Sequence, residues 1–251
     1  MSDFYNKEYY IDCDIKELHP DSRKIVILFH GLTSSLSEVK EISDKLKELK
    51  ISHFGPKLPG HFGDFNELNE LSKSDWLIFI KQIDSFISKN SELDFYIIGE
   101  SFGSILALNL KEQTNIKKMY LLSPPFEIKK HNKLLFLLSF LPDFLFKYFP
   151  KKNKDLERIK DYQVNHCFYP FHSFRAVVVL KKLSRLVKKS SCKINFYITR
   201  KDHIVLNNIS KLKDLFKNST IKEYDCIHEM LISDQKDIII SDITNEIKNA
   251  C

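Results

Sequence analysis

The five residues from Gly99 to Gly103, Gly-Glu-Ser-Phe-Gly, hold the most informative spacing in the chain. They fit the pattern G-x-S-x-G, in which a serine sits on a sharp turn between a strand and a helix with its hydroxyl raised for attack. Glycine leaves room for such a turn because it has no side chain. The chain has only 6 glycines, so two at this spacing are an unlikely coincidence. We interpret Ser101 as a candidate nucleophile; the alternative is an ordinary turn with an idle serine.

A serine hydroxyl needs a base to take its proton and an acid to orient that base. For a turn of this kind the chain order is Ser, then Asp or Glu, then His. Asp202 follows an expected strand at 193–199, and His228 stands in the loop after the last expected strand. Functional groups of parallel sheets gather at the carboxyl ends of strands. We therefore predict Asp202 as the acid and His228 as the base; the alternatives are an exposed turn aspartate and a surface histidine. Asp225 is the rival acid, but it lies too close in sequence to His228.

The oxyanion of a tetrahedral intermediate needs two backbone N–H donors. One is expected from the residue after the nucleophile, Phe102, and the other from the loop after the first core strand. His30-Gly31-Leu32 occupies that loop, so Leu32 is the second candidate. Gly31 would let the backbone approach closely, and His30 reads as a structural hydrogen-bonding residue.

Three residues are candidates for contact with a substrate: Gly31, His61 and Phe126. His61 belongs to a loop rich in Gly and Pro at 58–64, where it either positions the loop or lies at the rim of a pocket. Phe126 opens the part of the chain in which regular patterning stops.

Apolar runs alternate with helix-like spacing along much of the chain. The run that ends at Phe29 is uninterrupted, which is typical of a strand buried on both faces of a parallel sheet. Strands are expected at 23–29, 51–56, 94–99, 116–122, 193–199 and 220–224, and helices at 36–49, 72–87, 104–112, 174–187, 207–216 and 234–247. This alternation predicts an α/β fold with a doubly wound, mostly parallel sheet.

The alternation stops at residue 124 and resumes at 174. We predict an α/β core at 1–123 and 174–251 with an inserted lid or cap at 124–173. This segment contains an apolar block at 134–149 and a basic cluster at 151–154. The block could line a binding cleft, make transient contact with a membrane surface, or be plain core.

Composition narrows the function further. A chain of 251 residues with 43% hydrophobic residues suits one α/β domain or two small ones. The net charge of +6 is best explained by solvated helix faces, since no nucleic-acid fingerprint is present and no nucleic-acid partner is expected. Five widely spaced cysteines without a C-x-x-C pair indicate neither a disulfide framework nor a zinc site. With no signal peptide or membrane span in the sequence, we expect a cytoplasmic protein. No cofactor is expected, and the oligomeric state stays open.

Taken together, these motifs resemble the α/β-hydrolase superfamily, and within it the small bacterial carboxylesterases and monoacylglycerol lipases. The motifs that carry the resemblance are His30-Gly31-Leu32, Leu58-Pro59-Gly60-His61, Gly99-x-Ser101-x-Gly103, Asp202 and His228. The resemblance runs from about residue 24 to the C-terminus. It implies an α/β-hydrolase fold, a Ser101–His228–Asp202 triad and a cap that builds the acyl pocket.

Two departures loosen what the resemblance says about substrate. The loop Gly60-His61-Phe62-Gly63 is one residue longer than the family's Gly-His-Gly, and Ser104 stands where a second glycine is often found. We expect a serine hydrolase that cleaves a small-molecule carboxylic ester through an acyl-enzyme, with an acyl glycerol or a similar ester of medium or long chain as substrate. The alternatives are an acyltransferase or thioesterase with the same triad, and a non-catalytic ligand-binding protein of the same fold.

Overall fold

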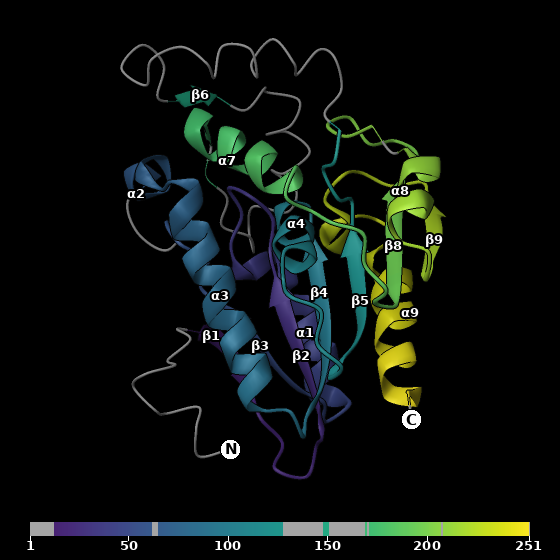
Figure 1. The fold of residues 1–251 in the computed structure, drawn as a ribbon. Helices are drawn as coiled ribbons and strands as arrows, with labels where there is room; N and C mark the ends of the chain where they lie inside the picture. Colours follow the sequence, from purple (N-terminus) through teal and green to yellow (C-terminus); the bar gives the residue numbers. More distant parts are fainter. Residues whose placement is uncertain are drawn as a thin grey trace.

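A computed structural model describes residues 13–61, 65–127, 148–150, 169, 171–206 and 208–250 (Figure 1). Within these residues, seven strands form one sheet in the spatial order β1-β3-β2-β4-β5-β8-β9. The strands are β1 (Cys13–Glu17), β2 (Lys24–Phe29), β3 (Ser52–Pro56), β4 (Asp94–Glu100), β5 (Ile116–Leu122), β8 (Ile194–Thr199) and β9 (Ser219–Tyr224). Only β1 is antiparallel to its neighbour, β3, so the predicted mostly parallel sheet is confirmed.

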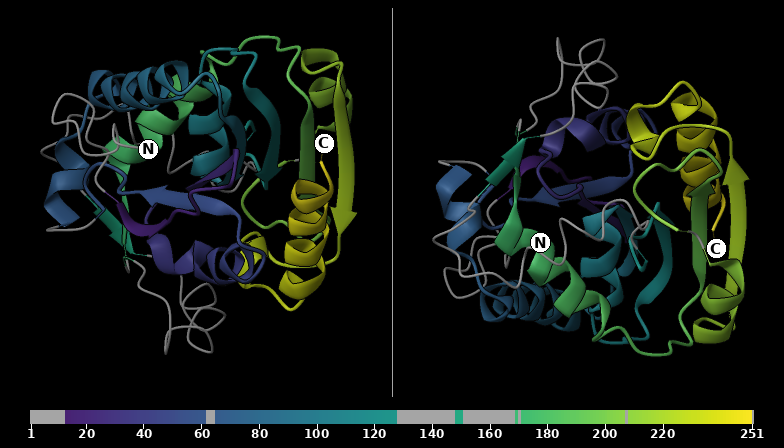
Figure 2. Two further views of the ribbon diagram at one scale, coloured as in Figure 1. Left: turned by 90° about the horizontal axis from the view of Figure 1, so that it is seen from below. Right: turned by 90° about the horizontal axis from the view of Figure 1, so that it is seen from above.

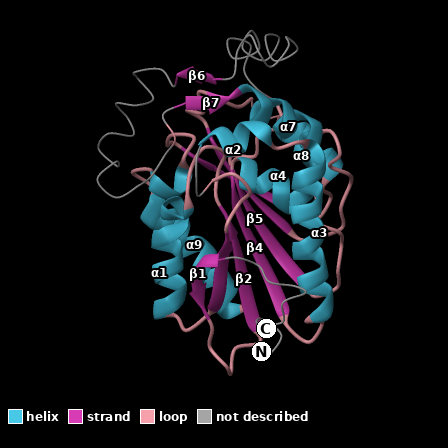
Figure 3. Ribbon diagram, turned by 90° about the vertical axis from the view of Figure 1, so that its left-hand side faces the viewer, coloured by secondary structure: helices cyan, strands magenta, loops and turns pink. Residues whose placement is uncertain are grey.

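Helices cover both faces of this sheet (Figure 3). One face carries the 3-10 turns η3 (Leu36–Val39) and η4 (Met230–Ile232) with the helices α1 (Lys40–Glu48) and α9 (Lys236–Asn249). The other face carries α2 (Phe65–Glu70), α3 (Lys73–Lys89), α4 (Phe102–Leu108), α7 (Phe174–Ser184) and α8 (Ile209–Leu215). Figure 2 shows the same layering from the two ends of the strands.

The two cores follow from the alternation of side chains along a strand. In β2, Ile25, Ile27 and Phe29 enter the core beneath α3 and α4. Val26 and Leu28 enter the core beneath α1 and α9. All five are buried, which explains why the sequence shows an unbroken apolar run.

Helix starts agree with the local sequence. Ser72 and Asp75 form a reciprocal capping box at the start of α3, in which the Ser72 side chain accepts from the Asp75 N–H. The helix predicted at 36–49 instead begins as the 3-10 turn η3, whose cap Ser35 accepts the N–H of Ser37. The short helix α2 was not among the predicted elements.

The predicted lid, 124–173, lies mostly outside the described residues. Its described parts include β6 (Tyr148–Pro150) and β7 (Phe171–Ser173), which pair antiparallel. The basic cluster at 151–154 and most of the apolar block at 134–149 are not described. The domain boundaries and the role of the block therefore stay predictions.

No helix in the described ranges is both long enough and apolar enough to cross a membrane.

Candidate active site

Ser101 lies at the carboxyl end of β4, where the chain turns into α4. Its backbone has φ 50° and ψ −114°, a conformation that non-glycine residues rarely adopt. The flanking glycines make this turn possible. A Cβ on Gly99 would lie 2.6 Å from the Gly103 carbonyl, and one on Gly103 would overlap the Phe29 carbonyl oxygen. Glycine is therefore needed at both positions for the predicted tight turn between β4 and α4.

The structure brings the three predicted triad residues into one hydrogen-bonded chain. His228 Nε2 lies 2.9 Å from Ser101 Oγ, and His228 Nδ1 lies 2.8 Å from Asp202 Oδ2. The rival acid Asp225 is instead exposed and forms an ion pair with Lys201 at 2.9 Å. This geometry allows Nε2 to accept the serine proton while the carboxylate fixes the tautomer of the ring.

Asp202 is held in place as a carboxylate. Its second oxygen, Oδ1, accepts the backbone N–H groups of Ile204 and Val205 at 2.8 and 2.7 Å. Burial raises the pKa of Asp202, but His228 and these N–H groups outweigh burial and leave the pKa below its ordinary value. The side chain is therefore ionised and oriented at neutral pH.

The electrostatic surroundings of His228 favour its protonated form. Burial lowers the pKa of this imidazole, but the nearby carboxylates of Asp202, Glu229 and Glu38 outweigh that effect and raise the pKa to about 9. These surroundings stabilise the imidazolium that forms when a serine gives its proton to the ring.

The two predicted oxyanion donors lie near Ser101. Phe102 is the first residue of α4, so its N–H is among those that no carbonyl of the helix accepts. Gly31 lies close to the nucleophile, since a Cβ built on it would be 3.5 Å from the Cβ of Ser101. Leu32 follows Gly31 directly and is half-buried against the core. The oxyanion role of Leu32 and Phe102 stays a prediction.

His61 is buried behind the loop that contains Leu32. Its Nε2 accepts the N–H of Thr33 at 3.3 Å, and its Nδ1 lies 2.9 Å from the Pro59 carbonyl oxygen. Burial lowers the pKa of His61 to about 4, so the ring is neutral at pH 7 and keeps an acceptor nitrogen. These contacts support loop positioning, and contact with substrate stays a prediction. His30 makes a structural contact of the same kind, with Nδ1 2.9 Å from the Gly31 oxygen.

Phe126 is half-buried, and its ring centroid lies 6.2 Å from that of Phe216. Its N–H donates to the Pro124 carbonyl at 2.9 Å. These contacts join Phe126 to the core beneath α8. The predicted role of Phe126 in substrate binding remains untested, because most of the segment that follows it lies outside the described residues.

Two buried acids beside the triad were missed by sequence reasoning. Glu38 accepts the N–H of Gly31 at 2.5 Å, and Glu100 accepts the N–H of Leu231 at 3.1 Å. The only available signal was their position, because Glu38 lies between the apolar Leu36 and Val39 and Glu100 ends an apolar strand. Acids are rarely fully buried unless a partner or a function holds them there.

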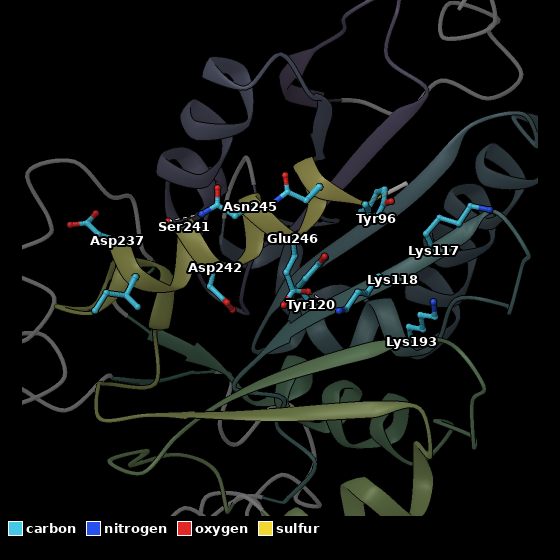
Figure 4. Close-up of a pocket in the computed structure, with 13 residues that line it drawn as sticks. Tyr96, Lys117, Lys118, Tyr120, Lys193, Asp237, Ser241, Asp242, Asn245 and Glu246 are labelled. Atoms are coloured by element: carbon cyan, nitrogen blue, oxygen red, sulfur yellow. Dashed lines mark hydrogen bonds and ion pairs between the residues drawn. The ribbon is translucent and has the colours of Figure 1, made fainter.

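A cleft of about 1140 Å³ opens at the opposite edge of the sheet (Figure 4). It is lined by Tyr96, Tyr120, Lys117, Lys118 and Lys193 from the beginnings of β4, β5 and β8, and by one side of α9. None of the triad residues lines this cleft, and within it Lys118 pairs with Glu246 at 2.7 Å. Among the described residues, no group of three or more His, Cys, Asp or Glu could hold a metal ion.

The chain is similar to one family model and to several solved structures. A family model described as serine aminopeptidase, S33, matches residues 20–230. Among solved structures, a metagenome-derived lipolytic enzyme has a TM-score of 0.72 at 18% identity, with 91% of this chain and 95% of that chain covered. No curated protein sequence matches the chain.

Two monoacylglycerol lipases have similar structures. The enzyme of Paleococcus ferrophilus has a TM-score of 0.65 at 16% identity, covering 89% of this chain and 93% of that chain. The enzyme of Saccharomyces cerevisiae, solved with a substrate analogue, has a TM-score of 0.65 at 13% identity, covering 94% of this chain and 89% of that chain. At these identities the likeness is one of fold.

Proposed function

We propose that this chain, which belongs to the serine aminopeptidase S33 family of α/β-hydrolases, is a serine hydrolase that cleaves carboxylic esters. The predicted α/β-hydrolase fold is confirmed by the family match and by the sheet. The observation that carries the proposal is the hydrogen-bonded chain from Ser101 through His228 to Asp202. We favour esters over peptides because the similar structures described above are a lipolytic enzyme and two monoacylglycerol lipases.

In the proposed mechanism, Ser101 Oγ attacks the ester carbonyl while His228 Nε2 takes its proton. The oxyanion is held by the N–H groups of Leu32 and Phe102. The same imidazolium then gives its proton to the departing alcohol, which leaves an acyl group on Ser101. Water, deprotonated by His228, releases the acid and restores the serine. Asp202 keeps the ring oriented and stabilises its charge throughout.

The proposed substrate is a small-molecule ester of medium or long acyl chain, such as an acyl glycerol. Support comes from the lipases of the same fold and from the Leu- and Phe-rich block at 134–149. The proposed mechanism needs no metal or organic cofactor. Cys192 and Cys226 are free thiols, which supports a reducing compartment such as the cytoplasm.

The proposal can be tested with a fluorophosphonate probe and a series of nitrophenyl esters of increasing chain length. The wild type should be labelled and should hydrolyse at least one ester. Ser101→Ala should abolish labelling and lower kcat on the order of 10⁴-fold or more, because triad residues act as a unit. Ser85→Ala is a matched control, since this serine is half-buried on α3 and its hydroxyl donates to the Lys81 carbonyl at 2.8 Å.

The proposal fails if the folded wild type neither reacts with the probe nor hydrolyses any chain length. Adding an alcohol or a thiol acceptor to the same assay separates a hydrolase from an acyltransferase. Product that goes mainly to the acceptor in excess water would overturn the assignment as a hydrolase.

A further inference from the structure

Two buried glutamates flank Ser101 without belonging to the triad. Glu38 is 3% exposed and Glu100 is 0% exposed. Each accepts a backbone N–H from a different loop, and each loop contains a group that the proposed reaction needs. A buried carboxyl is costly, so its contacts identify what it stabilises.

Glu38 holds the loop of the oxyanion donor. Its Oε2 accepts the Gly31 N–H at 2.5 Å. A Cβ placed on Gly31 would lie 3.2 Å from the same oxygen and 3.5 Å from the Cβ of Ser101. Gly31 is therefore packed between Glu38 and Ser101. The hydrogen bond from Glu38 holds Gly31 in place, and with it the N–H of the next residue, Leu32.

Glu100 holds the loop of the base. It immediately precedes Ser101 on β4, and its Oε1 accepts the N–H of Leu231 at 3.1 Å. Leu231 lies in η4, three residues after His228 in the chain. The side chain next to the nucleophile therefore ties down the segment that presents His228.

We propose that Glu38 and Glu100 are positioning residues that hold the oxyanion loop and the histidine loop on either side of Ser101. This inference rests on the proposed function, because the effect of the two glutamates is measured by the rate at which Ser101 reacts. It adds to the triad two residues that touch neither the substrate nor the reacting atoms.

The charge of Glu38 also acts on His228. Glu38 is faced by Glu229, His228 and Glu100. Glu100 is faced by Glu38, Glu229 and Cys226. Burial raises the pKa of Glu38 to about 7, with Glu229 raising it further. Burial raises the pKa of Glu100 well above its ordinary value, with Glu38 and Glu229 raising it further. The Oε2 of Glu100 is buried without a hydrogen-bond partner, which fits a neutral carboxyl. Glu38 is then the member of the pair whose charge favours the imidazolium of His228.

The test compares two substitutions at each site with a buried control. Glu38→Leu and Glu100→Leu remove the acceptor, whereas Glu38→Gln and Glu100→Gln keep an acceptor and remove the charge. Asp84→Asn is the control, because Asp84 is a buried acid that accepts the Lys111 N–H at 2.9 Å, away from Ser101. For each full-length variant, we would measure kcat and KM on an ester, the fluorophosphonate labelling rate, the urea unfolding curve and the pKa of His228 by NMR.

Both Leu variants should lower kcat and the labelling rate by on the order of 10²-fold with KM nearly unchanged, because misplaced groups weaken only the transition state. Glu100→Gln should restore most of the rate. Glu38→Gln should restore the rate at high pH and lower the pKa of His228 by about half a unit or more, since a facing negative charge is removed. Asp84→Asn should change stability alone.

The inference is overturned if folded Leu variants keep the wild-type kcat and labelling rate, or if Asp84→Asn lowers them equally. If a Leu variant does not fold, Glu38→Gln decides, and an unchanged His228 pKa with an unchanged pH profile contradicts the inference. A wild type that labels but hydrolyses no ester refutes the proposed function instead. In that case the labelling rates and the NMR titration still test Glu38 and Glu100.

Discussion

Charged side chains are held differently at the two edges of the central sheet, the one where its parallel strands begin and the one where they end. At the edge where the strands begin, Asp242 and Glu246 of α9 are partly exposed and paired with lysines. Lys118 contacts Glu246 at 2.7 Å, and Lys222 contacts Asp242 at 2.6 Å and Glu246 at 2.8 Å. At the edge where β4 ends, Glu38 and Glu100 are buried and accept the backbone N–H groups of Gly31 and Leu231.

This difference separates ordinary ion pairs from buried carboxyls whose pKa values are raised. Partly exposed ion pairs contribute little free energy and are screened by salt. Buried carboxyls beside a histidine shift pKa values, and such shifts cluster at functional sites. The edge at Ser101 is therefore a better candidate for catalysis than the cleft of Figure 4, which none of the triad residues lines.

The largest expected effect that tests the difference between the two edges comes from removing one acid at each. Asp202→Asn should lower kcat by about 10⁴-fold, because the amide stabilises the wrong tautomer of His228. Asp242→Asn at the opposite edge should leave kcat within about twofold, since it alters only a partly exposed network. Steady-state kinetics on one nitrophenyl ester measures both.

Asp225→Asn is the control for the assignment of the acid, since Asp225 is exposed and lies at the same edge as Asp202. It should behave like Asp242→Asn. A large loss of kcat in Asp225→Asn with full activity in Asp202→Asn would reverse the assignment.

The next largest effect is expected in the pH dependence. His228 must be neutral to act as a base, and its pKa is raised to about 9, so the ring is protonated and inactive below that pH. The value of kcat/KM should therefore rise about tenfold per pH unit and level off near pH 9, because kcat/KM reports the free enzyme. A plateau that already begins near pH 6.5, the ordinary pKa of histidine, would contradict the influence of the surrounding carboxylates.

The smallest effect is expected at the paired edge. Lys222→Met removes the cation shared by Asp242 and Glu246. It should lower the free energy of unfolding by about 1 kcal/mol or less, and high salt should shrink the difference. Urea unfolding at low and high salt measures this, and unchanged kcat and pH profile are expected. A shifted pH profile would show that the two edges are electrically coupled.

Local patterns were sufficient to predict the elements that place the triad. β2 and β4 are buried on both faces, so their unbroken apolar runs were readable as parallel strands. The positions of Ser101, Asp202 and His228 followed from one motif and from the chain order that the chemistry requires. The structure brings the three together, as the order required.

Long-range contacts could not be read in this way. Glu100 and Leu231 are separated by 131 residues, and no local pattern pairs a strand-end acid with a distant N–H. The contact between His61 and Thr33 likewise depends on how two loops meet in space. The short helix α2 was missed because six residues are too few to establish a helical period.

The backbone of Ser101 has an evolutionary consequence. A non-glycine residue at φ 50° costs about 1–3 kcal/mol, which is a sizeable part of the stability of an ordinary domain. Replacing this serine with glycine would relieve that backbone cost at the loss of the contact between Ser101 Oγ and His228 Nε2. Under the proposed function, selection for the hydroxyl offsets the backbone cost of keeping a serine at this position.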